Sequence, residues 1–206
     1  MTPLNRKLYR DLWRLRGQVL AIALVIASGI AVLAMSLTSM EALTETAIAY
    51  YERYRFGDVF ASVERAPEYL ADRVRKLPGV QAVDTRVVKS AVLDMEGFEE
   101  PVIGHLVSIP ERRPPDLNQL ALRSGRVPRL GYPDEAVLSE PFAEAHGLEQ
   151  GGTFRAVLNG NWRKLTVVGI ALSPEFVYTI GPGALMPDDK RFGIVWLGQE
   201  AMQAAF

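Results

Sequence analysis

The sequence predicts an α+β protein in which an N-terminal transmembrane helix is followed by an exported, split β-α-β-β domain with an inserted, mostly-β lobe. The first observation behind this prediction is that residues 18–40 contain no charged side chain. The second is that the rest of the chain alternates short apolar runs with helical patterns and Gly- or Pro-containing turns. The third is that the 206 residues contain no cysteine, so we expect an exported domain held together by its own apolar core.

The apolar run Val19–Leu37 has the length of a membrane span. At about 1.5 Å per residue it reaches roughly 28 Å, close to the ~30 Å hydrocarbon core of a bilayer. The apolar part of a signal peptide is shorter, about 7–15 residues, and ends at a small-residue cleavage site. Here the run is longer and Thr-Ser-Met-Glu follows it, so we interpret residues 18–40 as a transmembrane helix.

Basic residues before the span predict its orientation. Because Lys and Arg stay on the cytoplasmic side, the N-terminus is expected in the cytoplasm and the main domain in the periplasm or outside the cell, with the chain in the cell (inner) membrane. The topology-setting residues are Arg6, Lys7, Arg10, Arg14 and Arg16, against a single acid, Asp11.

The same segment, residues 1–17, has the pattern of an amphipathic helix. Leu4, Leu8, Leu12 and Leu15 recur at helical spacing and the arginines lie toward the other side. A basic amphipathic helix tends to lie against membrane lipids in the interface, with Gly17 as the elbow into the span. The alternative is a plain positive flank that only sets topology.

Small residues recur along one side of the span. Ala23, Ala27 and Ala31 are spaced by four, which would let a second helix approach closely, and we propose them as a helix-packing face. The alternative is that alanine is simply common in membrane helices.

After the span, helix-favouring residues continue without Gly or Pro to Phe56, which predicts a helical stalk over 41–56. Residues 57–116 together with 188–206 are predicted to form the α+β subdomain. Its expected elements are a strand at 58–63, a helix at 66–77 with Leu70, Val74 and Leu77 facing inward, extended segments at 80–83 and 86–93, and a strand at 102–109.

The Pro- and charge-rich stretch PERRPPDLNQ, 110–119, is interpreted as a linker that leads into the predicted inserted lobe, 117–187, and overlaps its first residues. Within the lobe we expect a strand at 135–138, a helix at 140–146 closed by Gly147, and a hairpin of 153–158 with 162–170 around Asn159-Gly160. The strand 192–197 is predicted to return to the sheet that contains 59–63. The chain ends at Phe206 inside a predicted helix, which we interpret as the end of a fragment.

Motifs for catalysis and cofactor binding are missing from the sequence. It contains no phosphate-binding loop, no HExxH and no GxSxG, and His105 and His146 lie far apart in the chain. A net charge of −1 gives no general attraction for nucleic acid. We therefore expect no enzyme activity, no cofactor, no metal and no nucleic-acid partner.

Four stretches resemble the FtsX/MacB-type permease subunits of ABC transporters, which carry the MacB-like periplasmic core domain. The stretches are LNRKLYRDLWRLRGQVLAIALVIASG, the LRSGRVP turn at 122–128, DEAVLSEPFAEAHGLEQG and LTVVGIALSPEFVY. Together the four stretches span nearly the whole chain. Each is short, and the match becomes specific through their order and spacing.

The resemblance implies a permease subunit of an ABC-type transport or mechanotransmission complex, powered by a separate cytoplasmic ABC ATPase. It implies a second permease subunit or a homodimer as partner, an exported adaptor as a further one, and lipid, lipoprotein, peptide or drug-like substrates. Such permeases have several spans, whereas this sequence has one, which agrees with a fragment. The alternative is a single-pass, membrane-anchored exported sensor or adaptor module.

Overall fold

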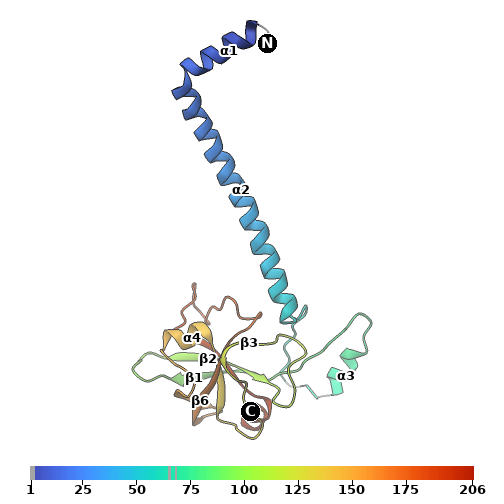
Figure 1. The fold of residues 1–206 in the computed structure, drawn as a ribbon. Helices are drawn as coiled ribbons and strands as arrows, with labels where there is room; N and C mark the ends of the chain where they lie inside the picture. The colour runs from blue at the N-terminus through green and yellow to red at the C-terminus, as the bar shows by residue number, and fades with distance from the viewer. Residues whose placement is uncertain (1–2, 65, 68) are drawn as a thin grey trace. The chain divides into compact units, whose positions relative to one another are not determined.

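The structure is a computed structural model that describes residues 3–64, 66–67 and 69–206. It consists of two compact units, Met1–Ala49 and Tyr50–Phe206. The first unit is helical and the second is built around one β-sheet (Figure 1). The predicted α+β class, with an apolar N-terminal helix ahead of a β-rich domain, is confirmed.

Two helices make up the N-terminal part. Helix α1 runs from Pro3 to Arg14 and α2 from Arg16 to Arg53. The interruption falls at Leu15, whereas Gly17, the predicted elbow, lies inside α2. The prediction of the elbow is therefore wrong by two residues, because the Gln18 and Val19 amides already bond to the Leu15 carbonyl and start the new helix there.

The domain contains seven strands and three short helices in its described residues. The strands are β1 (Val88–Asp94), β2 (Val102–Ile109), β3 (Ala121–Gly125), β4 (Glu135–Ser139), β5 (Thr153–Leu158), β6 (Asn161–Leu172) and β7 (Phe192–Gly198). The helices are α3 (Tyr69–Arg75), α4 (Glu140–Ala145) and α5 (Gln199–Ala205).

The strands form one sheet that closes on itself. Their order is β3-β6-β4-β7-β2-β1-β5, and β5 pairs with β6 as well. Closure depends on the length of β6: its first half, up to Thr166, pairs with β5, while Thr166–Ala171 pairs with β4 and Gly169–Leu172 with β3. The result is a barrel of mixed parallel and antiparallel strands.

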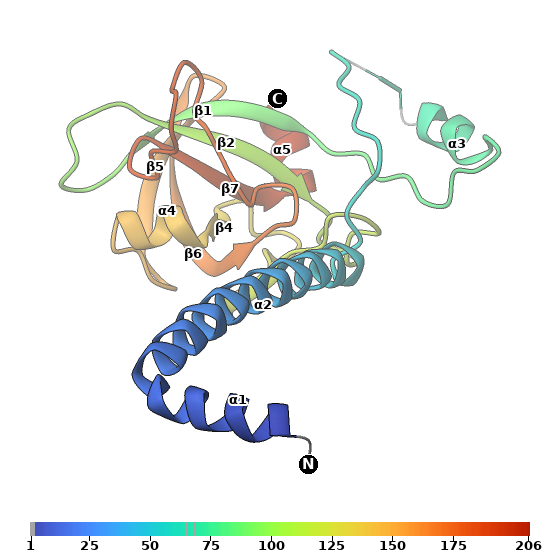
Figure 2. The ribbon, with the colours of Figure 1, turned by 90° about the horizontal axis from the view of Figure 1, so that it is seen from above.

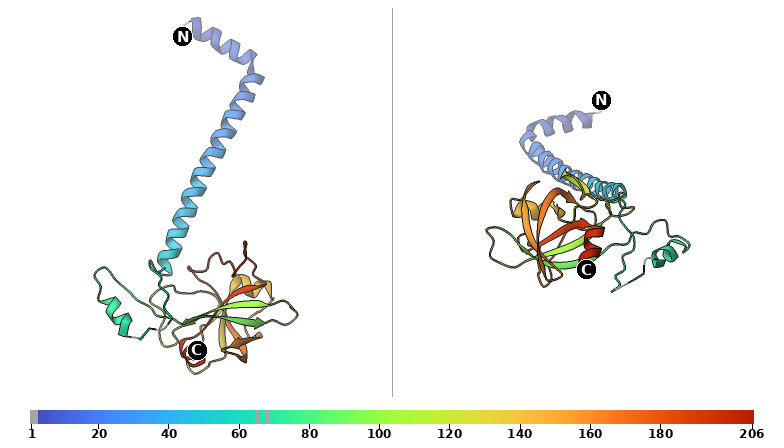
Figure 3. Two further views of the ribbon diagram at one scale, coloured as in Figure 1. Left: turned by 180° about the vertical axis from the view of Figure 1, so that it is seen from behind. Right: turned by 90° about the horizontal axis from the view of Figure 1, so that it is seen from below.

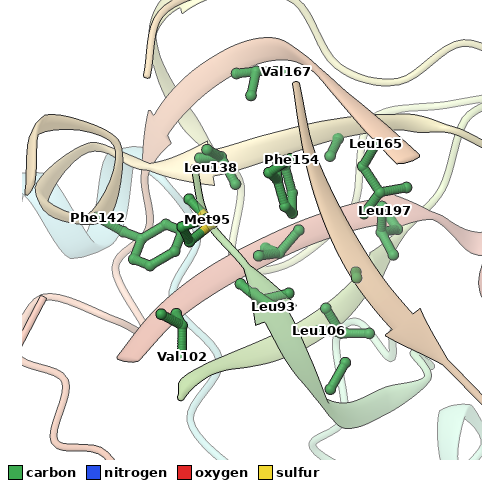
Figure 4. Packing of buried hydrophobic residues seen from close by; sticks show 14 of the residues in the cluster. Leu93, Met95, Val102, Leu106, Leu138, Phe142, Phe154, Leu165, Val167 and Leu197 are labelled. Carbon is green, nitrogen blue, oxygen red and sulfur yellow. The ribbon is translucent and has the colours of Figure 1, made fainter. Parts of the chain in front are cut away.

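Apolar side chains from most of these strands fill the barrel. Leu93, Leu106, Leu138, Phe154 and Leu165 point inward together, as Figure 4 shows. Phe142 of α4 and Met202 of α5 join the same cluster and are fully buried. This burial supplies the main stabilisation of the fold, since it removes roughly 25 cal/mol of unfavourable hydration per Å² of apolar surface.

A second apolar cluster contains other residues of β2, β4, β6 and β7. Val107, Val137 and Trp196 belong to it, and Leu120, Phe176 and Phe192 pack against it. Phe176 belongs to the segment between β6 and β7, so that connection is part of the packed structure.

The strand β7 overturns the predicted division of the exported region. It pairs in parallel with β2 and antiparallel with β4, so residues from 57–116, 117–187 and 188–206 share one sheet. The structure thus shows no separate lobe at 117–187. Alternation and turns locate strands, but they carry no information on which distant strand becomes the neighbour.

The segment before β1 differs from the prediction as well. Residues 59–63 form no strand, and Val59 and Val63 are exposed. Helix α3 covers only part of the predicted 66–77, in which Glu68 lies outside the described residues, and Val74 and Leu77 are exposed instead of facing a core. Figures 2 and 3 show α3 standing apart from the barrel.

The hairpin prediction is confirmed. Strands β5 and β6 are joined by Asn159 and Gly160, which both have positive φ, 46° and 79°. That pair of conformations is the two-residue turn that Asn-Gly favours. Gly147 also has the positive φ, 62°, expected of a residue that ends a helix.

Candidate functional surfaces

The topology-setting residues lie on α1 and at the start of α2. Arg6, Lys7, Arg10 and Arg14 are on α1, and Arg16 is the first residue of α2; all five are exposed. Leu8 and Leu12 are exposed too, so the helix offers both apolar and cationic side chains to its surroundings. This composition suits a membrane interface, and the sidedness of the helix stays a prediction.

Helix α2 is long and apolar enough to cross a membrane. None of its residues is buried in the described structure, so its apolar surface is available to lipid or to other helices. The Ser28 hydroxyl donates to the Val25 carbonyl oxygen (2.8 Å) and the Thr38 hydroxyl to that of Ala34 (2.9 Å). Both polar groups are therefore satisfied within the helix, as a lipid environment requires.

The proposed packing face lies along α2. Ala23, Ala27 and Ala31 are all exposed and follow one another at successive turns of the helix. Because these alanines are exposed, a larger side chain at any of the three positions would be costly only where a second helix packs against this face.

We expect Ala27→Leu to weaken association of the spans, whereas Val25→Leu should have little effect. A larger side chain at a close-packed seam forces the helices apart, and the van der Waals contacts between them are lost. Energy transfer between labelled copies of the chain in bilayers, or recovery of its complex from membranes, measures the difference. Equal effects at both positions would mean that the alanines reflect composition alone.

The end of α2 is tied to the domain by backbone hydrogen bonds. The amides of Asn118 and Gln119 donate to the carbonyl oxygens of Arg55 (2.8 Å) and Tyr54 (2.9 Å). The Asn118 side-chain oxygen accepts from the Gly57 amide at 3.1 Å. We call residues 54–57 together with 118–119 the junction.

The junction uses two unusual backbone conformations. Arg55 and Asn118 have positive φ, 52° and 48°, which is uncommon for residues other than glycine. The hydrogen bonds between them hold these conformations in place. Sequence reasoning placed Asn118 in a linker, and the Asn itself, a residue that tolerates this conformation, was the available signal.

A buried carboxylate organises the turn at 125–135. Glu135 is 7% exposed and accepts bonds from Arg126 (2.6 Å to each oxygen) and from the Arg129 guanidinium (2.7 Å) and amide (2.9 Å). The bond from Arg126, aided by those from Arg129, lowers the pKa of Glu135 to about 2. The SGR stretch is thus a structural turn in this domain, and its Arg126 lines a shallow depression together with Tyr132 and Thr166.

The segment between β6 and β7 has an anchored base and an apolar tip. At the base, Glu175 forms a bidentate ion pair with Arg86, and Phe176 packs against Trp196 with ring centroids 6.1 Å apart. Val177, directly after the base, is exposed, and at the tip Leu185 is 95% exposed and Met186 is exposed as well. Such side chains are available for contact with an apolar or amphiphilic molecule.

The two histidines occupy separate places. His105, on β2, lies against Phe176, and burial lowers its pKa. His146, at the end of α4, packs on Phe142 and makes a hydrogen bond of 2.9 Å with the Lys190 carbonyl oxygen. In the part of the chain that the structure describes, no group of three or more His, Asp or Glu side chains could hold a metal ion.

A scan against protein-family models finds no match, and neither does a search of the curated proteins. Among solved structures, the chain is similar to the extracellular domain of the noncanonic ABC-type transporter YknZ from Gram-positive bacteria, with 17% identity and a TM-score of 0.44 over 74% of this chain and 74% of that one. It is also similar to the periplasmic region of MacB from Actinobacillus actinomycetemcomitans, with 17% identity and a TM-score of 0.42 over 68% of this chain and 57% of that one.

Proposed function

We propose that this chain is part of a permease subunit of an ABC-type transport or mechanotransmission complex. Its span would sit among other membrane helices, and its β-rich domain would work on the exported side. A separate cytoplasmic ATPase would supply the energy, with a second permease subunit or a second copy of this one as the membrane partner. The chain itself would have no enzymatic activity.

The observation that carries the proposal is the junction. A single helix, α2, contains the candidate span and continues without interruption to Arg53, and the residues just after it are hydrogen-bonded to Asn118 and Gln119. In the proposed subunit, a displacement of the helix would reach the sheet through this turn, because β3 begins at Ala121, two residues after Gln119. A flexible Gly/Ser tether would absorb such a displacement.

The resemblance of the motifs in residues 4–29, 122–128, 134–151 and 165–178 to those of FtsX/MacB-type permeases supports the same function. The exposed apolar side chains of Val177, Leu185 and Met186 in the segment between β6 and β7 support contact with lipid, lipoprotein, peptide or drug-like molecules. A single-pass sensor or adaptor would also need a span and an exported domain, and it would have no use for a packing face on the span.

The topology experiment tests the orientation on which this function depends. The chain has no cysteine, so Asp11→Cys and Asn159→Cys each give a single thiol. We expect an impermeant thiol reagent to label position 159 on spheroplasts and to label position 11 only after lysis. Labelling of position 11 and protection of position 159 in intact spheroplasts would rule the proposal out.

The second test concerns nucleotide. The sequence contains no phosphate-binding loop, so we expect the chain, purified in detergent, to release no phosphate from ATP above background. A mock preparation from cells that lack the chain serves as the control for contaminating ATPases, because turnover found in it cannot belong to the chain. Turnover that belongs to the chain itself would contradict a subunit that depends on a separate ATPase.

A further inference from the structure

Three exposed side chains lie together on the outer face of the β5–β6 hairpin, two of them basic and one aromatic: Arg155, Lys164 and Trp162. Arg155 of β5 and Lys164 of β6 are direct cross-strand partners. Like charges opposite each other in an antiparallel pair are destabilising. Trp162 lies two residues from Lys164 on the same strand, hence on the same face, and is 59% exposed.

The three side chains form one continuous surface, which we call the hairpin patch. The Arg155 guanidinium lies over the Trp162 ring, 5.4 Å from the centroid, and its side chain is 64% exposed. Val157, the cross-strand partner of Trp162, is half-buried beside it. The opposite face of the hairpin is occupied by the core residues Phe154 and Leu165, so the patch is free to face outward.

Of the two basic side chains in the hairpin patch, Arg155 is already paired with a carboxylate and Lys164, within the described part of the chain, is not. The Arg155 Nε donates to the Asp94 carboxylate at 2.7 Å, which neutralises much of that charge. Arg163, on the other face of β6, pairs with Asp134 at 3.5 Å. Lys164 belongs to none of the ion pairs formed among the described residues, so its ammonium group is the cation that a ligand would meet.

We propose that the hairpin patch is a docking surface for a soluble exported protein that presents a carboxylate beside an apolar or aromatic contact. The inference rests on the proposed function, because it requires the domain to lie on the exported side. Trp and Arg, together with Tyr, are enriched among the residues that dominate binding energy at protein interfaces. Lys164 supplies charge complementarity for an acidic partner.

An anionic bilayer fits the patch less well. Recruitment to a lipid surface by charge takes clusters of about 4–8 basic residues, each worth about 1 kcal/mol. Here one unpaired ammonium group is available, and the Trp162 ring is covered on one side by Arg155. A protein partner can satisfy a single ammonium group and an aromatic edge with specific contacts, which a fluid lipid surface does not offer.

The position of the patch in the domain suits a soluble partner. The C-terminal end of β6, at Leu172, pairs with Ala121 close to the junction, whereas the hairpin lies at its N-terminal end. About 36 Å of strand separates Asn161 from Leu172 at ~3.3 Å per residue. A partner bound at the patch therefore leaves the junction free to move.

Selection of displayed peptides on the full chain in detergent micelles tests the proposal. We expect the enriched peptides to carry Asp or Glu next to an aromatic or aliphatic residue. Their Kd, from a fluorescence titration of labelled peptide, should rise at least tenfold with Trp162→Ala and with Lys164→Glu. Lys89→Glu is the matched control: Lys89 is another exposed lysine near an aromatic ring, that of Phe206, and its change should leave the Kd unaltered.

A charge exchange gives the decisive readout. Reversing the acidic residue of the best peptide to Lys should restore its binding to the Lys164→Glu chain, because the ion pair is rebuilt with opposite signs. Peptides that bind equally to all variants, or a selection that yields no acidic peptide, would overturn the proposal. So would Trp162-dependent binding to vesicles containing anionic lipid, which would assign the patch to a membrane.

Failure here is distinguishable from failure of the proposed function. The thiol-labelling experiment reports on sidedness through Asp11 and Asn159, and it needs neither Trp162 nor Lys164. A chain with the expected topology and no peptide binding would retain the permease assignment and lose the docking surface.

Discussion

Replacing Gly125 with alanine is expected to destabilise the domain by about 3–4 kcal/mol, among the largest effects of any single substitution in the chain. Gly125 has φ +74°, and an added Cβ would lie 2.8 Å from the Gly169 Cα and overlap the Val168 carbonyl oxygen. Both neighbours are backbone atoms of β6, so relief requires the two strands to separate. That separation would also break the hydrogen bond that the Arg126 backbone amide donates to the Val168 carbonyl oxygen (2.9 Å).

Gly131→Ala is the matched control for this prediction. Gly131 has a similar φ, +80°, and an added Cβ there meets nothing within 4 Å. The cost of Gly131→Ala is that of holding an alanine at positive φ, about 1 kcal/mol. Thermal unfolding of the full chain in detergent, followed by near-UV circular dichroism of the buried Trp196, separates the two effects. Equal losses would show that β3 and β6 do not approach as described.

Replacing Glu135 with glutamine should cost about 3 kcal/mol of folding free energy near neutral pH. The carboxylate is buried and bonded to Arg126 and Arg129, and its pKa is lowered from 4.5 to about 2. Since the folded pKa lies below the unfolded one, the stabilisation is complete above pH ~4.5 and is lost as the pH falls toward 2. Glu135→Ala should cost more, because it also leaves a cavity beside two cations.

The pH dependence identifies the cause. In the native chain the free energy of unfolding should decrease as the pH is lowered from about 4.5 to 2. This dependence on pH should be weaker in Glu135→Gln. Asp134→Asn, a change in the neighbouring and exposed carboxylate, should cost less than about 1 kcal/mol and keep the slope. An unchanged slope in Glu135→Gln would mean that the carboxylate is not bonded to the arginines in solution.

The contacts of Gly125 and Arg126 give the SGR stretch a structural role in this chain. Gly125 allows β3 to lie against β6, and Arg126 then reaches the carboxylate at the start of β4. The stretch was recognisable in the sequence as a turn, whereas its two partners, Gly169 and Glu135, were not. Gly169 lies 44 positions after Gly125 in the chain, and only the sheet brings the two glycines together.

Local signals in the sequence determined the elements that depend on neighbours in the chain. The apolar run from Val19 to Leu37 predicted a helix of spanning length, because the number of consecutive apolar residues is enough to decide it. Asn159-Gly160 predicted the hairpin, because a two-residue turn with positive φ admits few other sequences. The basic residues before the span lie on α1 and at the start of α2, as the helical pattern of this segment predicted.

Tertiary structure alone decided what depends on distant partners. The apolar strand β7 could have joined any sheet, and pairing with β2 on one side and β4 on the other made one barrel of the two predicted lobes. The alternating residues 58–63 found no partner strand and stayed exposed. The opposition of Arg155 and Lys164 also arose only when the register of β5 and β6 was set. The physical reason is that strand hydrogen bonds are made between backbones, which are alike everywhere, so the choice of partner follows from how the whole set of apolar faces can be buried together.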